Sequence, residues 1–599
     1  MKQTKYTADV LVVGGGIAGC FAAIKARENG ASVILADKGY VGKSGQTPQT
    51  NTFAIFDPKI HDIKNYMYVA NTTGDYMNDR DWSEIVFKNS WARWQELVSW
   101  GITIYKWDRH GVPYESAAAE DDGGEPVKMP LNPYGMGTKQ HMQSVRHPVR
   151  KHAEIMRRQA EKVGVTIMDR VCIVELLKQD GRCAGAVGIS PDSGDALIFL
   201  TKATVLCSGP AGLKSPGLRC MCTGDSDAMG YRAGCTITGK EWEETHPVRS
   251  DFPAWPWAAK DRDRLRTFMT ERKMNTPTYN ALDEMVGLHW SRLATHHLEA
   301  FQAFEGKAPT VWETTSGMSE FQEMHHSPKG YPRSEFDDYL EKRGRVRMVM
   351  GRAVGQSSHV ADGIWPVNKQ CESEIPGLYS AGDSLGARAA GAEYPGQGFA
   401  TCYSSVTGAI AGEAAAKLSK ETETPEVGEQ ELQRALNYVF APYDQVGGFS
   451  PAWATQVMQA TLFPYWVLYV KSEERLQTAL KQIEYMQRDV IPKLTARDFH
   501  ELRLAHETRN MALNAEMKLK ASLLRKESRG AHFREDYPKR IDPYGLKWIK
   551  IKQENGEMKF FDEPVPEKWW PDLTLPYEKR YIRRFPIKLN GEQAEGVEA

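Results

Sequence analysis

The fold is decided by a stretch near the amino end that reads Asp9-Val10-Leu11-Val12-Val13-Gly14-Gly15-Gly16-Ile17-Ala18-Gly19. The apolar run at its start predicts a short, buried parallel strand. Residues Ala18–Asn29 then have the composition of a helix that ends at Gly30. The next apolar run, Ser32–Ala36, predicts a second strand, so the chain begins with a β-α-β unit.

The turn of this unit fits the pattern G-x-G-x-x-G at Gly14, Gly16 and Gly19. The first glycine allows a tight turn, the second lets the backbone approach a pyrophosphate, and the third lets helix and strand pack closely. The helix N-terminus offers N–H groups and partial positive charge to the phosphates. Asp37 ends the second strand, where an acidic residue holds ribose hydroxyls. This order of features favours a dinucleotide site over a purely structural turn.

A second motif favours FAD over NAD. Leu378–Asp383 reads Leu-Tyr-Ser-Ala-Gly-Asp. It resembles the second flavin motif of flavoproteins with two dinucleotide-binding folds, whose acidic residue binds the ribityl chain. Gly398 then precedes a predicted helix to Leu418. The N-terminus of that helix would stabilise negative charge on the flavin pyrimidine edge by roughly 0.3–2 kcal/mol. A plain strand–turn–helix is the alternative.

Composition narrows the class of protein. The chain has 599 residues, 41% hydrophobic and 26% charged, with a net charge of -1. This balance argues against nucleic-acid binding, which needs a basic excess. Its 9 cysteines form no Cys-x-x-Cys pair and no run of iron–sulfur ligands. With no signal peptide or membrane span in the sequence, we expect a cytoplasmic protein. The most apolar segment, Ala460–Val470, is predicted to be a buried helix.

The whole pattern predicts an α/β fold: a Rossmann-like FAD-binding domain with an inserted α+β capping domain and a C-terminal helical domain. Leu197–Leu200 and Ala203–Cys207 are predicted as separate strands. The predicted boundaries are 1–238 and 353–422 for the FAD-binding domain, 239–352 for the capping and substrate domain, 430–525 for the helical domain and 526–599 for a tail that wraps the body.

These motifs resemble the fumarate reductase and succinate dehydrogenase flavoprotein superfamily, and within it the alpha subunit of adenylylsulfate reductase. Thr223-Gly224-Asp225 matches the segment that leads into the cap, and Arg525–Pro538 matches the C-terminal signature of the family. The expected cofactor-binding residues are Gly14, Gly16, Ala18, Gly19, Asp37, Lys38, Ser44, Gly45, Ser208, Gly209, Asp225, Gly382, Asp383 and Gly398. Some relatives link FAD to a histidine after the second strand. The comparable segment here, Gly42–Gln46, has none, so we expect non-covalent FAD.

Three residues are predicted to act on the substrate. His246 and Arg249 follow the cap entry, and His359 precedes Gly363. Both places resemble positions where relatives put substrate-binding histidine or arginine. Arg249 would bind an anionic group, and the histidines would orient substrate or transfer protons. Arg388 is a weaker candidate. An arginine that merely pairs with a carboxylate is the structural alternative.

The substrate and the partner stay open at this point. The cap lacks the Arg-bearing Glu-Gly-Gly segment of fumarate-type members, which disfavours a classical dicarboxylate enzyme. Aromatic cap residues could instead stack on a planar substrate or form cap core; they are Phe252, Trp255, Trp257 and Trp312.

The resemblance implies two-electron reduction of a small anionic substrate, with electrons from a ferredoxin-like iron–sulfur subunit. The alternatives are an electron-transfer module without its own substrate, or a reductase of unsaturated aromatic carboxylates. The basic, aromatic segment Lys568–Lys588 would either dock that partner or pack on its own subunit.

Overall fold

The computed structural model describes residues 2–110, 113–126, 128–130, 143–148, 150–215, 222–243, 247–249, 277–282, 284–288, 306–307, 310–314, 346–352, 354–396 and 398–581.

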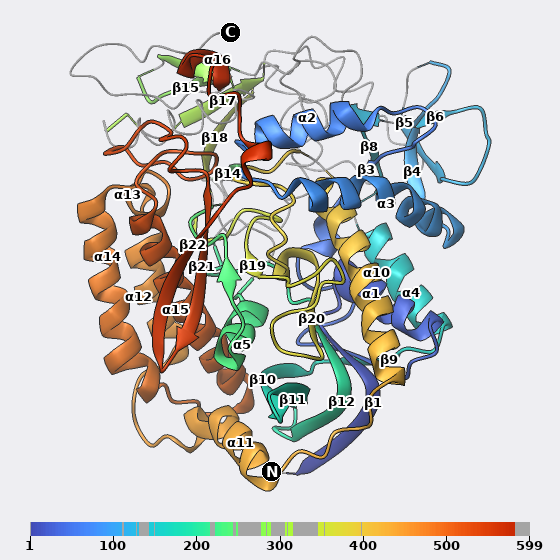
Figure 1. Ribbon diagram of the computed structural model, residues 1–599, viewed down its shortest axis with the longest axis vertical. Helices are drawn as coiled ribbons and strands as arrows, with labels where there is room; N and C mark the ends of the chain where they lie inside the picture. The colour runs from blue at the N-terminus through green and yellow to red at the C-terminus, as the bar shows by residue number, and fades with distance from the viewer. Residues whose placement is uncertain are drawn as a thin grey trace.

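A seven-stranded sheet forms the body of the protein (Figure 1). The strand order is β10-β11-β12-β1-β2-β9, and β20 pairs with β12. Strands β1, β2, β9, β12 and β20 are parallel, while β10 and β11 add an antiparallel extension. The strands span Gln3–Val13 (β1), Val33–Asp37 (β2), Thr166–Asp169 (β9), Cys172–Gln179 (β10), Arg182–Ile189 (β11), Ala196–Leu206 (β12) and Leu378–Ser380 (β20).

The predicted β-α-β start is confirmed, with helix α1 at Ile17–Glu28 between β1 and β2. Val13 at the end of β1 lies beside Ala36 of β2 and Leu206 of β12, so three carboxyl ends meet at one edge. The expected break within β12 was wrong. The buried Thr201 continues the ladder opposite Ala8, and its hydroxyl contacts that of Thr204 at 3.3 Å.

Helix α10, Phe399–Lys420, packs directly on α1. A Cβ at Gly408 would lie 2.3 Å from the carbonyl oxygen of Ala18, and one at Gly412 would lie 2.2 Å from that of Ala22. Small residues therefore let the two helices approach more closely than any side chain would allow. Helix α3 (Arg80–Ser99) packs on α10, α4 (Lys151–Lys162) packs on α1, and α2 (Ile63–Thr73) packs on α3.

The described part of the predicted cap contains a five-stranded antiparallel sheet in the order β14-β18-β17-β15-β16. It lies at the top of Figure 1. Its strands span Pro247–Arg249 (β14), Pro277–Tyr279 (β15), Met285–Leu288 (β16), Thr310–Thr314 (β17) and Val346–Arg352 (β18).

The predicted helical domain is confirmed and lies on the left of Figure 1. The single buried helix expected at Ala460–Val470 was wrong: α12 ends at Leu462, and a separate short helix, α13, spans Tyr465–Leu468. Pro464 between them has no N–H to donate, which ends the first helix. The main helices are α11 (Glu429–Asp444), α12 (Pro451–Leu462), α14 (Glu473–Tyr485) and α15 (Phe499–Leu524).

The segment after α15 joins the body rather than only wrapping it. Strand β21, Lys547–Glu554, pairs with β13, Ile237–Thr238, and forms a hairpin with β22, Glu557–Pro564. Further on, Trp569 and Tyr581 are buried. The described part of the Lys568–Lys588 segment therefore packs on its own chain, and residues 582–588 lie outside the described part.

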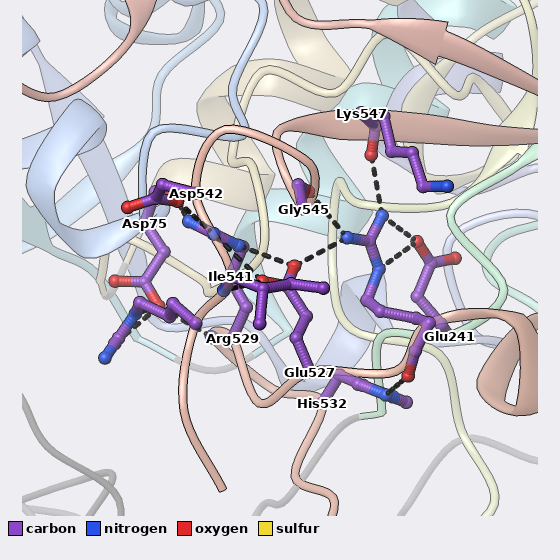
Figure 2. Close-up of polar contacts among 12 residues, drawn as sticks. Asp75, Glu241, Glu527, Arg529, His532, Ile541, Asp542, Gly545 and Lys547 are labelled. Carbon is purple, nitrogen blue, oxygen red and sulfur yellow. Dashed lines mark hydrogen bonds and ion pairs between the residues drawn. The ribbon is translucent and has the colours of Figure 1, made fainter. Parts of the chain in front are cut away.

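A buried ionic cluster holds the C-terminal signature in place (Figure 2). Glu527 is at its centre and accepts hydrogen bonds from Arg525 at 2.9 Å and from Arg529 at 2.8 Å. Arg525 also binds Glu241 at 2.9 Å, and Arg529 binds Asp542 at 2.6 Å. Burial alone would raise the pKa of Glu527, but the two arginines lower it to about 2. This motif thus ties the tail to the segment that leads into the cap.

We predict that Glu527→Gln lowers the stability of the protein by about 3 kcal/mol, because it removes the buried carboxylate that two guanidinium groups share and leaves Glu241 and Asp542 to neutralise them. Urea unfolding followed by circular dichroism measures this loss. The matched control is Glu557→Gln, which removes an exposed partner of Lys559 and should leave the urea midpoint close to that of the wild type. Equal midpoints for both variants would show that the cluster is not stabilising.

Candidate active site

A cavity of about 600 Å³ opens at the carboxyl ends of β1, β2, β12 and β20. In α/β sheets, ligands bind at this edge. Twelve of the predicted cofactor-binding residues line it: Gly14, Gly16, Ala18, Asp37, Lys38, Ser44, Gly45, Ser208, Gly209, Asp225, Gly382 and Asp383. The fold therefore brings these twelve residues, which are far apart in the sequence, together around one cavity.

The other two predicted residues, Gly19 and Gly398, do not line the cavity, but each allows a close backbone contact next to it. A Cβ at Gly19 would lie 1.8 Å from the carbonyl oxygen of Gly14, so only glycine lets α1 start so close to the turn. Gly398 precedes α10 with a φ of +86°, and a Cβ there would lie 2.7 Å from the backbone nitrogen of Ala54.

The glycine turn presents backbone rather than side chains to the cavity. Gly14 has a φ of +104°, and a Cβ on it would lie 2.4 Å from the carbonyl oxygen of Cys207. Gly16 precedes α1 and contributes no capping side chain. The backbone N–H of Ile17 donates to the Thr47 hydroxyl at 2.9 Å. This arrangement leaves the positive end of α1 facing the cavity, where it can bind phosphate.

Asp37 ends β2 and is nearly buried, with 8% exposure. One carboxylate oxygen accepts from the Gly15 N–H at 2.7 Å. The other accepts from the Gly39 N–H and the Ser44 hydroxyl, both at 2.7 Å. A carboxylate has about four acceptor positions, so this one can hold the turn together and still accept from a ribose hydroxyl.

Lys38 and Asp225 both line the cavity, and Nζ of Lys38 lies 2.8 Å from a carboxylate oxygen of Asp225. Lys38 also pairs with Glu507 of α15 at 3.0 Å, and Glu507 binds Arg503 at 2.5 Å and Lys214 at 2.6 Å. Burial disfavours these charges, but their mutual attraction raises the pKa of Lys38 and lowers the pKa of Asp225 and of Glu507. The helical domain thus supplies one wall of the cavity.

The second motif forms the opposite wall. The N–H of Gly382 donates to the Thr407 hydroxyl of α10 at 3.0 Å. Asp383 accepts from the Val360 N–H at 3.0 Å and lies 3.3 Å from Nδ1 of His359. Ala400 and Thr401, in the first turn of α10, also line the cavity.

His359 is therefore placed beside this motif, as part of a His–Asp pair. The His359 side chain is 13% exposed, and its ring lies 5.5 Å from that of Tyr394. The Tyr394 hydroxyl in turn accepts from the Ala400 N–H at 3.0 Å.

The remaining predicted residues have different outcomes. Arg249 ends β14, where its backbone pairs with Met350. His246, Phe252, Trp255 and Trp257 lie outside the described residues. Arg388 does not line the cavity but a separate pocket between tryptophans. Sequence reasoning missed the cavity residues Thr47, Lys214, Arg503 and Glu507.

Two family comparisons match the chain. Residues 9–251 match the FAD binding domain family, and residues 456–581 match the fumarate reductase flavoprotein C-terminal family. The first includes the glycine turn, Asp225 and Glu241, and the second includes Glu507 together with Arg525, Glu527, Arg529 and Asp542 of the buried cluster.

Known proteins match across nearly the whole length. A fumarate reductase (CoM/CoB) subunit from Methanothermobacter marburgensis is 25% identical over 568 residues, 90% of this chain and 96% of that protein. An uncharacterised FAD-dependent oxidoreductase of Methanocaldococcus jannaschii is 26% identical over 552 residues, 88% of this chain and 94% of that protein.

Solved structures share the fold. Adenylylsulfate reductase from Archaeoglobus fulgidus superposes with a TM-score of 0.73 at 20% identity, covering 94% of this chain and 96% of that chain. A quinol-fumarate reductase gives a TM-score of 0.77 at 17% identity, covering 96% and 100%. The glycine-lined cavity, the two family matches and these relatives agree: the chain belongs to the fumarate reductase and succinate dehydrogenase flavoprotein superfamily and is an FAD-dependent oxidoreductase.

Proposed function

We propose that this chain is the flavoprotein subunit of a reductase that acts on a small anionic substrate with electrons from a ferredoxin-like iron–sulfur partner. The observation that carries the proposal is the contact between His359 and Asp383, which joins a candidate catalytic side chain to the flavin motif. When bound, FAD supplies two-electron transfer at its N5 atom. A module that only relays electrons would have no use for a proton-transfer group at this position.

The fit of the cavity to FAD supports this assignment. Gly14 and Gly16 would accommodate the pyrophosphate, with the N-terminus of α1 behind them. Asp37 would hold the adenosine ribose, and Asp383 the ribityl chain. Ser44, Gly45, Ser208 and Gly209 would complete the contacts.

The roles of the substrate residues follow from charge and position. Asp383 faces Nδ1 of His359, which orients the ring and favours the tautomer with the proton on Nδ1. The other nitrogen, Nε2, is then the one that would exchange a proton with substrate. Arg249 would bind the anionic group of the substrate, and His246 would orient it.

The partner and the location are part of the same proposal. The relative from Methanothermobacter marburgensis is itself named as one subunit of its enzyme, and this sequence has no run of cysteines to hold its own cluster. Among the described residues, no helix is both long and apolar enough to span a membrane. We propose a cytoplasmic two-subunit enzyme.

We predict that FAD is bound non-covalently and is released when the protein is denatured in acid. The cavity lining that the structure describes includes no histidine or tyrosine to form a link. Its two cysteines, Cys207 and Cys222, are both buried, and burial raises the pKa of the Cys207 thiol, which keeps it unreactive. After trichloroacetic acid precipitation, the yellow colour should be in the supernatant. A yellow pellet that keeps its flavin through washing would refute the prediction.

We predict that His359→Gln lowers turnover by about 10²–10⁴-fold, the usual contribution of a proton-transfer group, while the flavin content stays normal. The assay follows oxidation of reduced methyl viologen under anaerobic conditions with adenylyl sulfate, fumarate or an unsaturated aromatic acid. Arg249→Ala should also lower turnover by orders of magnitude.

The matched control is His500→Gln, which changes an exposed histidine on α15 and should leave turnover intact. If the wild type reduces no compound of this panel yet passes electrons to an acceptor protein, the relay module is the correct function. Full activity of His359→Gln on a reducible substrate would remove His359 from the mechanism.

A further inference from the structure

We propose that this chain has a second ligand site, outside the flavin cavity, that binds a small carboxylate with an apolar or aromatic body. The site is a pocket of about 250 Å³ between the body and the C-terminal hairpin. Its lining shares no residue with that of the flavin cavity. The inference is independent of the proposed function.

Arg388 is the central feature of this pocket. Its guanidinium lies 3.5 Å from the ring centroid of Trp365 and 4.7 Å from that of Trp548. The side chain is 6% exposed. Two aromatic faces therefore fix the guanidinium plane and shield it from water, an environment in which an anion binds more strongly than in solution.

The hydrogen bonds of Arg388 are incomplete. Nη1 donates to the Gly386 carbonyl at 2.5 Å, and Nη2 reaches Asp79 only at 3.5 Å. In the described part of the chain, Nε has no hydrogen-bond partner. Burial lowers the pKa of Arg388 to about 10, although Asp79 favours the charged form. A buried donor without a good partner is costly, and a carboxylate could improve on the long contact that Nη2 makes with Asp79.

A second cation lies close by. Nζ of Lys369 is 3.2 Å from Asp79 and 4.8 Å from the ring centroid of Trp82, with its side chain 38% exposed. The Asp79 carboxylate therefore serves two cations and also accepts from the Trp82 N–H at the start of α3. Glu563, the other acid of the lining, pairs with Lys550 at 2.9 Å. Lys550 does not line the pocket, but with Glu563 neutralised by it the remaining charges are those of Arg388, Lys369 and Asp79, a sum of one positive charge that matches a monoanion.

Size and shape restrict the ligand further. The volume is slightly below the roughly 300 Å³ at which pockets for drug-sized molecules begin. Trp82, Trp365, Trp548 and Trp569 supply flat apolar walls. Arginine binds a planar carboxylate through parallel hydrogen bonds, so a flat aromatic acid fits both the charge and the walls.

The test uses benzoate as the probe and isothermal titration of the flavin-loaded protein. We expect benzoate to bind with a Kd of about 1 mM or lower, and benzamide, its neutral analogue, not to bind. Arg388→Lys and Lys369→Ala should each weaken benzoate binding by at least about tenfold, the effect of one charge-assisted hydrogen bond. Lys369 is partly exposed, so its variant should fold even if the Arg388 variant does not.

His359→Gln is the control for the other site and should bind benzoate as the wild type does, with no change in the flavin spectrum on titration. The proposal is overturned by no binding to wild type at about 10 mM benzoate. Unchanged affinity in Lys369→Ala, or loss of binding in His359→Gln, would also overturn it.

Discussion

The structure depends on one close contact between backbones. At the turn after β1, the chain passes so near to β12 and to the start of α1 that no side chain fits at Gly14 or Gly19. Because α1 begins there, its N-terminus points into the cavity, and α10 can pack on it through Gly408 and Gly412. The space for a diphosphate is therefore made by the absence of side chains.

Ion pairs link the residues of this cavity to the helical domain. Glu507 extends from the helical domain and meets Lys38, which follows β2, and Lys214, which follows β12. The second connection is the buried cluster of Glu527, which joins the C-terminal signature to the cap entry through Arg525 and Glu241. The cavity wall and the contact between the tail and the body thus contain the same class of buried ion pair, in which each partner neutralises a charge that burial alone would disfavour.

The sequence predicted the parts of this site that depend on local pattern. The β-α-β unit and the glycines that require a positive φ leave a signal in a few adjacent residues, and twelve of the fourteen predicted cofactor residues line the cavity. Arg503 and Glu507 left no such signal. Four residues apart on a helix, they are indistinguishable in sequence from an exposed ion pair, and only the packing of α15 on the body shows their role.

For Arg388 the local sequence pattern pointed to the wrong site. Its position five residues after the flavin motif suggested a catalytic cation, but the chain turns there, with a φ of +59°, and places the guanidinium between Trp365 and Trp548. One of these tryptophans is more than 150 residues away along the chain, so no local pattern could reveal the pocket. The break at Pro464, by contrast, follows from the sequence alone, because proline has no N–H to continue a helix even among apolar residues.

The most direct test of the account is a titration of the flavin-free protein with FAD, followed by flavin fluorescence. The account predicts that the wild type binds one FAD per chain, and that Gly14→Ala weakens binding by at least about tenfold because its Cβ would meet a backbone oxygen. Gly428→Ala, where a Cβ would meet nothing within 4 Å, should bind as the wild type does. Equal affinity of Gly14→Ala and the wild type, or a wild type that binds no FAD, would contradict the account.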